Sequence, residues 1–186
     1  MRRPFPRGVT LLETVIYIGL LAITLPYMTS FLLKTQSEHQ VFQARTQMEE
    51  TAGILLSQLS YDISGADDIS TSTSTLGTDD SALKFHDDFG TLITIDRPTV
   101  AVNFESGSQN VRRLRYQHGN DPAVYITGDA IDVTQWRVVA VRDSTNTLTG
   151  VHISLNLAML NPGTPYRNAA FLADTTLSLQ PHTVEN

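Results

Sequence analysis

Residues 8–33 read GVTLLETVIYIGLLAITLPYMTSFLL, and the interpretation of the whole sequence depends on this stretch. Glu13 is its one charged residue, and it lies between the flanking charges of Arg7 and Lys34. An α-helix rises about 1.5 Å per residue, so about 20 apolar residues are enough to cross the hydrocarbon core of a bilayer. Residues 9–33 are therefore predicted to form a helix that spans a membrane.

Residues 1–8, MRRPFPRG, precede this helix as a short basic leader with three arginines and no acidic residue. Positive charge is retained on the cytoplasmic side of a membrane, so we expect the leader to stay inside and the rest of the chain to be exported. A secretory signal has a shorter apolar region followed by a cleavage site of small residues, and neither feature is present here. The leader and the helix together predict a different kind of processing.

The glutamate inside the apolar stretch is the least expected residue of this region. An ionised carboxylate within a membrane helix costs about 2.5 to 3.5 kcal/mol, so such a residue generally has a partner. A basic leader that ends in Gly8, followed by Val9-Thr10-Leu11-Leu12-Glu13 at the start of an apolar helix, resembles a known signal. It is similar to the cleavage and methylation signal of type IV prepilins and type II secretion pseudopilins.

The resemblance implies a set of processing and assembly steps. Prepilin peptidase would cleave after Gly8 and N-methylate Val9, and Glu13 would pair with the N-terminal amine of a neighbouring subunit. Two charges that are each costly in hydrocarbon become tolerable when they meet. The implied partners are the peptidase, other pilin or pseudopilin subunits, the inner-membrane assembly platform and the membrane itself. Val9 in place of the commoner Phe, and the early position of Pro26, favour a minor or divergent member of the family over a major pilin.

Residues 34–65 continue the helix with an amphipathic pattern. Gly65 is the expected end, and Gly53 weakens the helix by about 1 kcal/mol without excluding it. We predict one helix over residues 9–64, about 84 Å long, with a bend or local opening at Pro26. The stripe is interpreted as packing against the chain's own domain, with a coiled-coil partner as the alternative. Its apolar residues recur at steps of three and four: Val41, Ala44, Met48, Ala52, Leu55 and Leu59.

Residues 66–186 are predicted to form an exported β-rich domain. The run STSTST at 70–75, followed by LGTDDS, is interpreted as a flexible connector. One long helix followed by several strands without βαβ alternation predicts an α+β fold, with the helix packed on an antiparallel sheet as in pilins. The order of the late strands also resembles minor pseudopilins of the J type. Strands are predicted at residues 82–86, 91–96, 99–104, 111–116, 123–126, 136–142, 148–158 and 171–180.

Composition and charge limit the possible partners. The chain has 186 residues, a formal net charge of −6 and no cysteine, which excludes disulfides and thiol chemistry. Removing the three leader arginines would change the net charge to −9, which argues against DNA as a partner. Arg112, Arg113 and Arg115, beside Tyr116, are nevertheless a basic cluster that a DNA-binding pseudopilin would use. Charged residues on a strand also guard a sheet edge against aggregation.

Nothing in the sequence points to catalysis. Aspartates occur in pairs and singly without the spacing of a calcium-binding loop, and are interpreted as solvated turn residues. The histidines at positions 39, 86, 118, 152 and 182 lack the spacing of a helical metal pair. No nucleotide-binding loop or nucleophile elbow is present. We therefore predict no catalytic residue, no cofactor and no metal site.

The predicted function is mechanical. The chain is expected to be a minor pilin or pseudopilin held in the inner membrane by one helix, with its C-terminal domain outside the cytoplasm. Assembly would place it in a type II secretion pseudopilus or a type IV pilus. Two alternatives stay open: a membrane-anchored extracytoplasmic binding module whose helix never leaves the bilayer, and a competence pseudopilin that contacts DNA.

Overall fold

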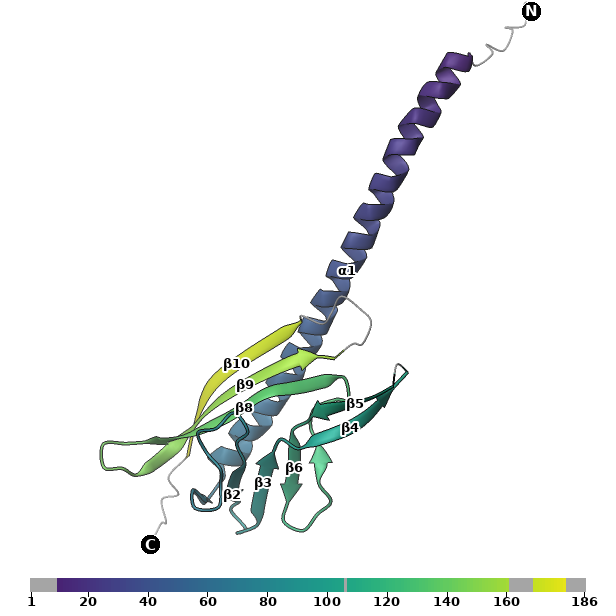
Figure 1. The fold of residues 1–186 in the computed structure, drawn as a ribbon. Coiled ribbons are helices and arrows are strands. Elements are labelled where there is room, and N and C mark those ends of the chain that lie inside the picture. The colour runs from purple at the N-terminus through teal and green to yellow at the C-terminus, as the bar shows by residue number, and fades with distance from the viewer. Residues whose placement is uncertain (1–9, 106, 161–168, 180–186) are drawn as a thin grey trace, which may run out of the picture. The chain divides into compact units, whose positions relative to one another are not determined.

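The structure is a computed structural model that describes residues 10–105, 107–160 and 169–179. The chain forms two compact units, Met1–Gln40 and Val41–Asn186. The first unit holds the apolar part of the long helix α1, and the second holds the rest of α1 together with the ten strands of the described residues (Figure 1). Gly8 and Val9 lie outside the described residues.

Helix α1 extends over Leu11–Ser64 and confirms the long helix that the sequence predicts. At its start the Thr10 hydroxyl accepts a hydrogen bond from the backbone N–H of Glu13 at 3.3 Å, which caps the first turn. At its end the N–H of Gly65 donates to the carbonyl of Tyr61 at 3.1 Å, so the helix stops where the glycine predicts. Pro26 lies inside α1 and the helix continues on both sides of it. A local opening at this position is not observed, and a bend stays a prediction.

The stripe on the second half of α1 is buried against the strands of its own unit. This confirms packing against the chain's own domain, because the stripe and the strands contribute to one core cluster. Val41 is an exception, since 37% of it is exposed, and the prediction that it belongs to the stripe is wrong. Ile63, one turn beyond Leu59, is fully buried and extends the stripe instead. The buried residues of α1 are Ala44, Met48, Ala52, Leu55, Leu59 and Ile63.

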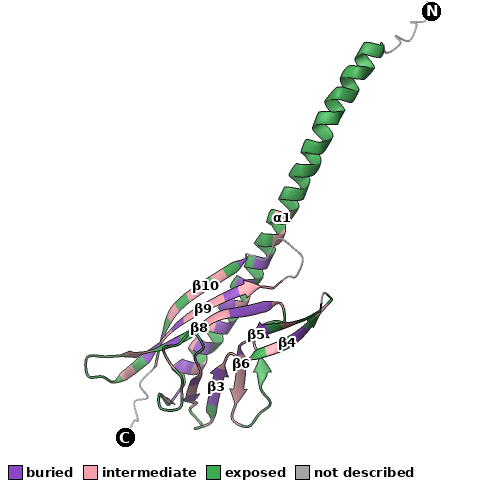
Figure 2. Ribbon diagram, in the orientation of Figure 1, coloured by how far each residue is buried: buried purple, intermediate pink, exposed green. Residues whose placement is uncertain are grey.

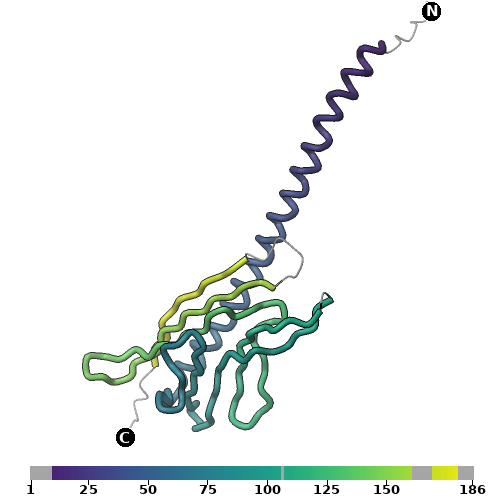
Figure 3. The backbone as a smooth tube through the Cα atoms, in the orientation of Figure 1, coloured from purple at the N-terminus to yellow at the C-terminus, as the bar shows by residue number. Residues whose placement is uncertain are grey.

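The strands form a five-stranded sheet in the order β1-β2-β3-β6-β7, a three-stranded sheet in the order β10-β9-β8, and the hairpin β4-β5. Neighbouring strands pair antiparallel throughout, as the sequence predicts. Figure 3 follows the backbone through them and shows the tip of the β8–β9 hairpin reaching past the neighbouring strands. The bounds are β1 Asp68–Ile69, β2 Leu83–His86, β3 Leu92–Asp96, β4 Thr99–Phe104, β5 Gly107–Arg112, β6 Arg115–His118, β7 Val124–Tyr125, β8 Ile131–Arg142, β9 Leu148–Met159 and β10 Ala170–Ser178.

One predicted strand, over residues 111–116, is wrong. The chain leaves β5 at Arg112 and enters β6 at Arg115, and these two strands belong to different sheets. Between them Leu114 is fully buried, and its backbone N–H donates to the Thr127 hydroxyl at 3.2 Å. The adjacent Arg112 and Arg113 interrupt the alternation of apolar and polar residues at this change of partner, and the single predicted strand ran across that interruption.

The serine and threonine run at 70–75 is not the flexible connector that its composition predicts. The backbone N–H of Lys84 donates to the Ser74 hydroxyl at 2.9 Å, and Thr75 forms a β-bridge with Ala82. Further along, Gly77 donates its N–H to the carbonyl of Val138 on β8 at 2.7 Å. The segment therefore connects β2 of one sheet to β8 of the other.

The core lies between the second half of α1 and the inward faces of the strands. Figure 2 shows the buried residues gathered there, with alternating burial along the strands of the three-stranded sheet. Trp136 on β8, Phe85 on β2 and Met48 on α1 are the largest of the fully buried side chains. All of the core cluster belongs to the unit that begins at Val41.

Candidate functional site

The first half of α1 exposes its apolar side chains. A window of this helix has a mean hydropathy of 1.8, contains few charged residues and buries none of its residues. A helix that is apolar on all sides is stable in a membrane or inside a large core, and no core covers this one within the described residues. The helix is thus long and apolar enough to span a membrane. Exposed fractions run from 53% for Ile16 to 85% for Leu11.

Threonine hydroxyl groups on this part of α1 donate hydrogen bonds to carbonyls of the helix itself. Thr24 donates to the carbonyl of Leu20 at 2.9 Å, and Thr29 donates to that of Leu25 at 2.7 Å. A polar group in hydrocarbon that lacks a hydrogen bond costs several kcal/mol. These back-bonded threonines fit a helix that is surrounded by lipid or by other apolar helices.

Glu13 lies in the first turn of α1, where the exposed partial charge of the helix N-terminus favours a negative group. Its Oε1 accepts one long hydrogen bond, from the Tyr17 hydroxyl at 3.4 Å. No ion pair joins its carboxylate to another described residue. The carboxylate is thus free to meet a positive group from outside the described chain.

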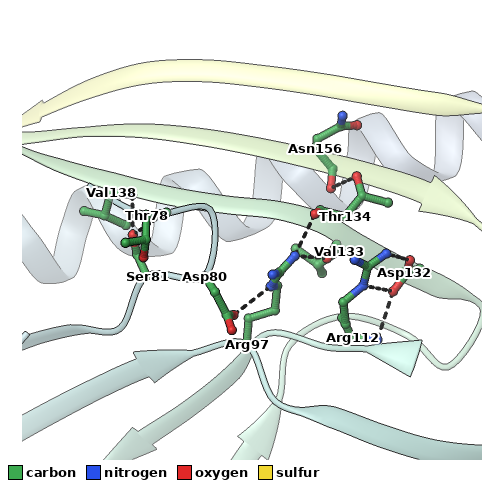
Figure 4. A network of polar contacts seen from close by, with 10 residues as sticks. All are labelled: Thr78, Asp80, Ser81, Arg97, Arg112, Asp132, Val133, Thr134, Val138 and Asn156. Atoms are coloured by element: carbon green, nitrogen blue, oxygen red, sulfur yellow. Dashed lines mark hydrogen bonds and ion pairs between the residues drawn. The ribbon is translucent and has the colours of Figure 1, made fainter. Parts of the chain in front are cut away.

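The three arginines that the sequence groups together have three separate partners. Arg112 binds Asp132 through its backbone N–H at 2.9 Å, through Nε at 3.0 Å and through an ion pair to the second oxygen (Figure 4). Arg115 forms an ion pair with Asp96, and Arg113 forms one with Asp129. The Arg113 guanidinium also lies 4.4 Å from the centroid of the Tyr125 ring.

These contacts shift the pKa values of the Arg112 pair. Burial by itself raises the pKa of Asp132, but the hydrogen bonds and charge of Arg112 outweigh it and hold the pKa below its usual range. The hydrogen bond to Asp132 in turn raises the pKa of Arg112. Asp132 is only 7% exposed, so the interpretation of the aspartates as solvated turn residues is wrong at this position.

Arg97 is a residue that sequence reasoning missed. Its side chain is 8% exposed, and its Nε donates to the carboxylate of Asp80 at 3.0 Å. Its Nη1 donates to the carbonyls of Val133 at 2.8 Å and Thr134 at 2.7 Å (Figure 4). A single arginine between two strands carries no sequence signal for this role, because its three partners come from distant positions in the chain.

Histidines that are scattered in the sequence pair with aspartates in the structure. The Nε2 of His118 lies 2.9 Å from a carboxylate oxygen of Asp87, and its Nδ1 lies 3.6 Å from Asp121. Two further histidines form cross-strand pairs at 2.7 Å, His86 with Asp68 and His152 with Asp174. No group of three or more metal-binding side chains gathers within the described part of the chain.

Comparison with known proteins adds no further constraint. No model of a known protein family matches the chain, and neither a curated protein nor a solved structure does. Two regions thus remain as candidate sites, each defined by its own residues. They are the exposed apolar half of α1 with Glu13, and the arginine and aspartate network of the β-rich unit.

Proposed function

We propose that this chain is a minor pilin or pseudopilin subunit of a type II secretion pseudopilus or a type IV pilus. One observation carries the proposal: α1 joins an apolar, uncovered half with a single carboxylate near its start to a half whose stripe is buried in a β-rich unit. A subunit whose helix moves from a bilayer into a filament needs both halves. The function is mechanical and involves no catalysis by this chain.

Processing is the first step of the proposal. Prepilin peptidase cleaves between Gly8 and Val9 on the cytoplasmic face and methylates the new amine. The subunit then waits in the inner membrane, with its β-rich unit outside the cytoplasm. The apolar half of α1 supplies the surface that lipid covers before assembly and that other helices cover afterwards.

Assembly is the second step, and Glu13 sets its register. In hydrocarbon, an unpaired carboxylate and an unpaired ammonium each cost several kcal/mol, and their pairing removes most of that cost. The Tyr17 hydroxyl holds one oxygen of Glu13 and leaves the other for the N-terminal amine of a neighbouring subunit. The pair therefore favours one axial position of each subunit over others.

Replacement of Gly8 by a bulky residue tests processing. With the peptidase present, the parent chain should lose residues 1–8 and migrate faster in electrophoresis, whereas Gly8→Leu should keep the mobility of the precursor. Mass spectrometry of the parent chain should find a methylated Val9. An unchanged mobility of the parent chain with and without the peptidase would contradict the proposal and favour a membrane-anchored binding module.

Replacement of Glu13 by glutamine tests assembly separately. Glu13→Gln should still be cleaved and still enter the membrane, but it should be absent from filaments sheared off the cells. Glu49→Gln is a matched control, because Glu49 lies on an exposed part of α1 and forms only a surface ion pair with Arg45 at 3.3 Å. Equal incorporation of the two variants would argue against the role of Glu13.

DNA is not favoured as a partner. Arg112, Arg113 and Arg115 are each neutralised by an aspartate, so their charge is already used within the unit. A competence role predicts that neutralising all three abolishes transformation while filaments persist. The paired geometry predicts instead that such a variant loses stability first.

A further inference from the structure

Strand β10, Ala170–Ser178, forms one edge of the three-stranded sheet. Its inner side pairs with β9 over nine consecutive residues without a register shift, from Ala170 opposite Ala158 to Ser178 opposite Gly150. Its outer side pairs with no other described strand. Such an edge is a template for a further strand.

The backbone groups of the free side can be assigned from the ladder. The backbone N–H of Leu179 donates a hydrogen bond to the carbonyl of Thr149, and the carbonyl of Ala169 accepts one from the backbone N–H of Met159. Antiparallel partners alternate between pairs that exchange hydrogen bonds and pairs that do not, so the odd-numbered residues bond to β9. The even-numbered residues direct their N–H and C=O groups to the free edge: Ala170, Leu172, Asp174, Thr176 and Ser178.

The sequence of β10 carries one feature that keeps edge strands apart, the charge of Asp174. It contains no lysine, arginine or proline, and the irregularities of this sheet lie between β8 and β9 instead. The edges of the five-stranded sheet, β1 and β7, have only two residues each, which gives a second strand little to pair with. Among the described strands, β10 thus offers a long and regular edge whose one charged residue is Asp174.

The side chains of β10 favour a strand with alternating character. Its odd-numbered residues face the core, and Phe171 and Ala173 there are only partly buried at the margin of the core cluster. Its even-numbered residues face outward, and Leu172 is 63% exposed. An added strand with apolar residues on the inner face would cover Phe171 and Ala173, which increases the buried apolar area.

We propose that β10 is a docking edge for an extended segment of a different protein chain. The segment pairs with the even-numbered residues, places apolar side chains over Phe171 and Ala173, and places a basic residue opposite Asp174. This carboxylate is 56% exposed, and its Oδ1 accepts contacts from His152 and Ser154 on β9. A basic residue on the other side would meet its remaining oxygen.

A second copy of β10 is a poor occupant. In the antiparallel arrangement that uses all of the even-numbered residues, Asp174 would lie opposite Asp174 of the other copy, and directly opposed like charges destabilise a pair of strands. Shifting the register by two residues avoids that contact but leaves backbone groups at the ends unpaired. The edge therefore favours a partner of different sequence, and this inference does not depend on the proposed pilin function.

A peptide probe tests the docking edge on the full chain in detergent micelles. The peptide copies Leu148–Met159, the natural antiparallel neighbour of β10, with lysine in place of Ser154. In the register of β9 this lysine lies opposite Asp174. Bound peptide should slow amide hydrogen exchange, measured by NMR, by about tenfold or more at Leu172, Asp174 and Thr176.

Two variants at one position isolate the backbone contribution. Leu172→Pro removes an N–H that points to the free edge and leaves the ladder to β9 intact, so it should abolish the protection. Leu172→Thr changes the side chain but keeps the N–H, so the protection should remain. If the Leu172→Pro spectrum shows unfolding, Thr176→Pro replaces it, because its N–H has the same direction.

Three outcomes would overturn the proposal. The first is no protection at about millimolar peptide, where even weak strand addition would be visible. The second is equal protection in Leu172→Pro and the parent chain, and the third is protection that rises with protein concentration without peptide, which would show a second copy as the occupant. A peptide with glutamate in place of the lysine should bind more weakly, and equal binding would contradict the role of Asp174.

Discussion

Asp132 carries a negative charge at a position that is only 7% exposed, and Arg112 forms an ion pair with it. We predict that Asp132→Asn lowers the free energy of unfolding by about 2 kcal/mol, because it weakens charge-assisted hydrogen bonds and leaves a partly buried guanidinium. Asp129→Asn is the matched control. It breaks an ion pair whose carboxylate is 65% exposed, so it should cost less than about 1 kcal/mol in chemical denaturation.

The pH dependence of the same pair follows from the direction of the shift. The pKa of Asp132 is lower in the folded state than the usual value of about 3.9. The stabilisation of the folded state by ionised Asp132 is therefore present at pH values above that usual pKa. It is lost as the pH falls through the pKa of the folded state. Acid titration of the parent chain should show this loss below about pH 4, and Asp132→Asn should lack that component.

Gly150 is a position where any side chain would collide with the neighbouring strand. A Cβ there would lie 2.2 Å from the carbonyl oxygen of Leu177 and 3.0 Å from the Cα of Ser178, both of which are backbone atoms of the β10 region. We predict that Gly150→Ala costs about 1 to 3 kcal/mol or more in thermal or chemical unfolding. Gly53→Ala is the control of opposite sign, because a Cβ on that helical residue meets nothing within 4 Å and should stabilise α1 by about 1 kcal/mol.

At the scale of elements, His118 on β6 joins two turns of the five-stranded sheet. The turn after β2 contributes Asp87, which also accepts the backbone N–H of Thr91 at 2.7 Å, and the turn after β6 contributes Asp121. The hydrogen bond to Asp87 is the main cause that raises the pKa of His118, and it lowers the pKa of Asp87. The protonated histidine thus holds the two turns together.

The sign of this effect can be tested by NMR. Because the pKa of His118 is raised, the stabilisation of the two turns by the protonated histidine is complete below about pH 6.5. It is lost as the pH rises through the pKa of His118 in the folded state. Amide exchange at Thr91, corrected for the intrinsic dependence on pH, should accelerate across this range. His118→Gln should show no such step, and His152→Gln should keep it. A parent chain without the step would contradict the role of His118.

Asp62 interacts with His118 through its charge, and Tyr116 is hydrogen-bonded to Asp62. Asp62 on α1 has a raised pKa because burial outweighs the hydrogen bond from Gln58. Burial and the charge of Asp62 raise the pKa of Tyr116 to about 12, so it stays neutral across the range tested. Asp62 is therefore the second titrating group near His118 on the acidic side, and an Asp62→Asn variant would separate its contribution.

The predictability of these elements depends on whether their causes are local. The helix and most strands follow from periodicity, so α1, β2, β3 and β4 lie where the sequence predicts within about two residues. The break between β5 and β6 follows from a change of pairing partner, and its only local sign is the adjacent Arg112 and Arg113, which interrupt the alternation. The contacts of Arg97 and the order in the segment 70–75 are likewise made with residues far away in sequence.

At the scale of the whole molecule, the candidate sites also differ in whether the local sequence reveals them. Glu13 is recognisable from sequence, because a charge in an apolar run is anomalous wherever the chain folds. The free edge of β10 requires the strand order, which depends on the pairing of β9 with β8 on its other side. A membrane-related role is therefore inferred from sequence, whereas a docking edge is inferred from topology.

The division of the chain into two units leads to a final prediction. The lowest-numbered residue of the core cluster is Ala44, so a chain that begins at Val41 keeps the whole core. It should be soluble without detergent, unfold cooperatively, and give amide chemical shifts beyond residue 66 that match those of the full chain in micelles. Aggregation, or a spectrum without dispersion, would show that the apolar half of α1 is needed for folding.

A second truncation, which is expected not to fold, is the negative control for this experiment. A chain that begins at Gln58 lacks Met48, Ala52 and Leu55, which fill the core from the helix side. Removing one large buried side chain costs about 2 to 5 kcal/mol, while a domain is stable by only about 5 to 15 kcal/mol in total. This chain should therefore show no cooperative transition. The contrast between the two truncations would locate the folding information of α1 in the half whose stripe is buried.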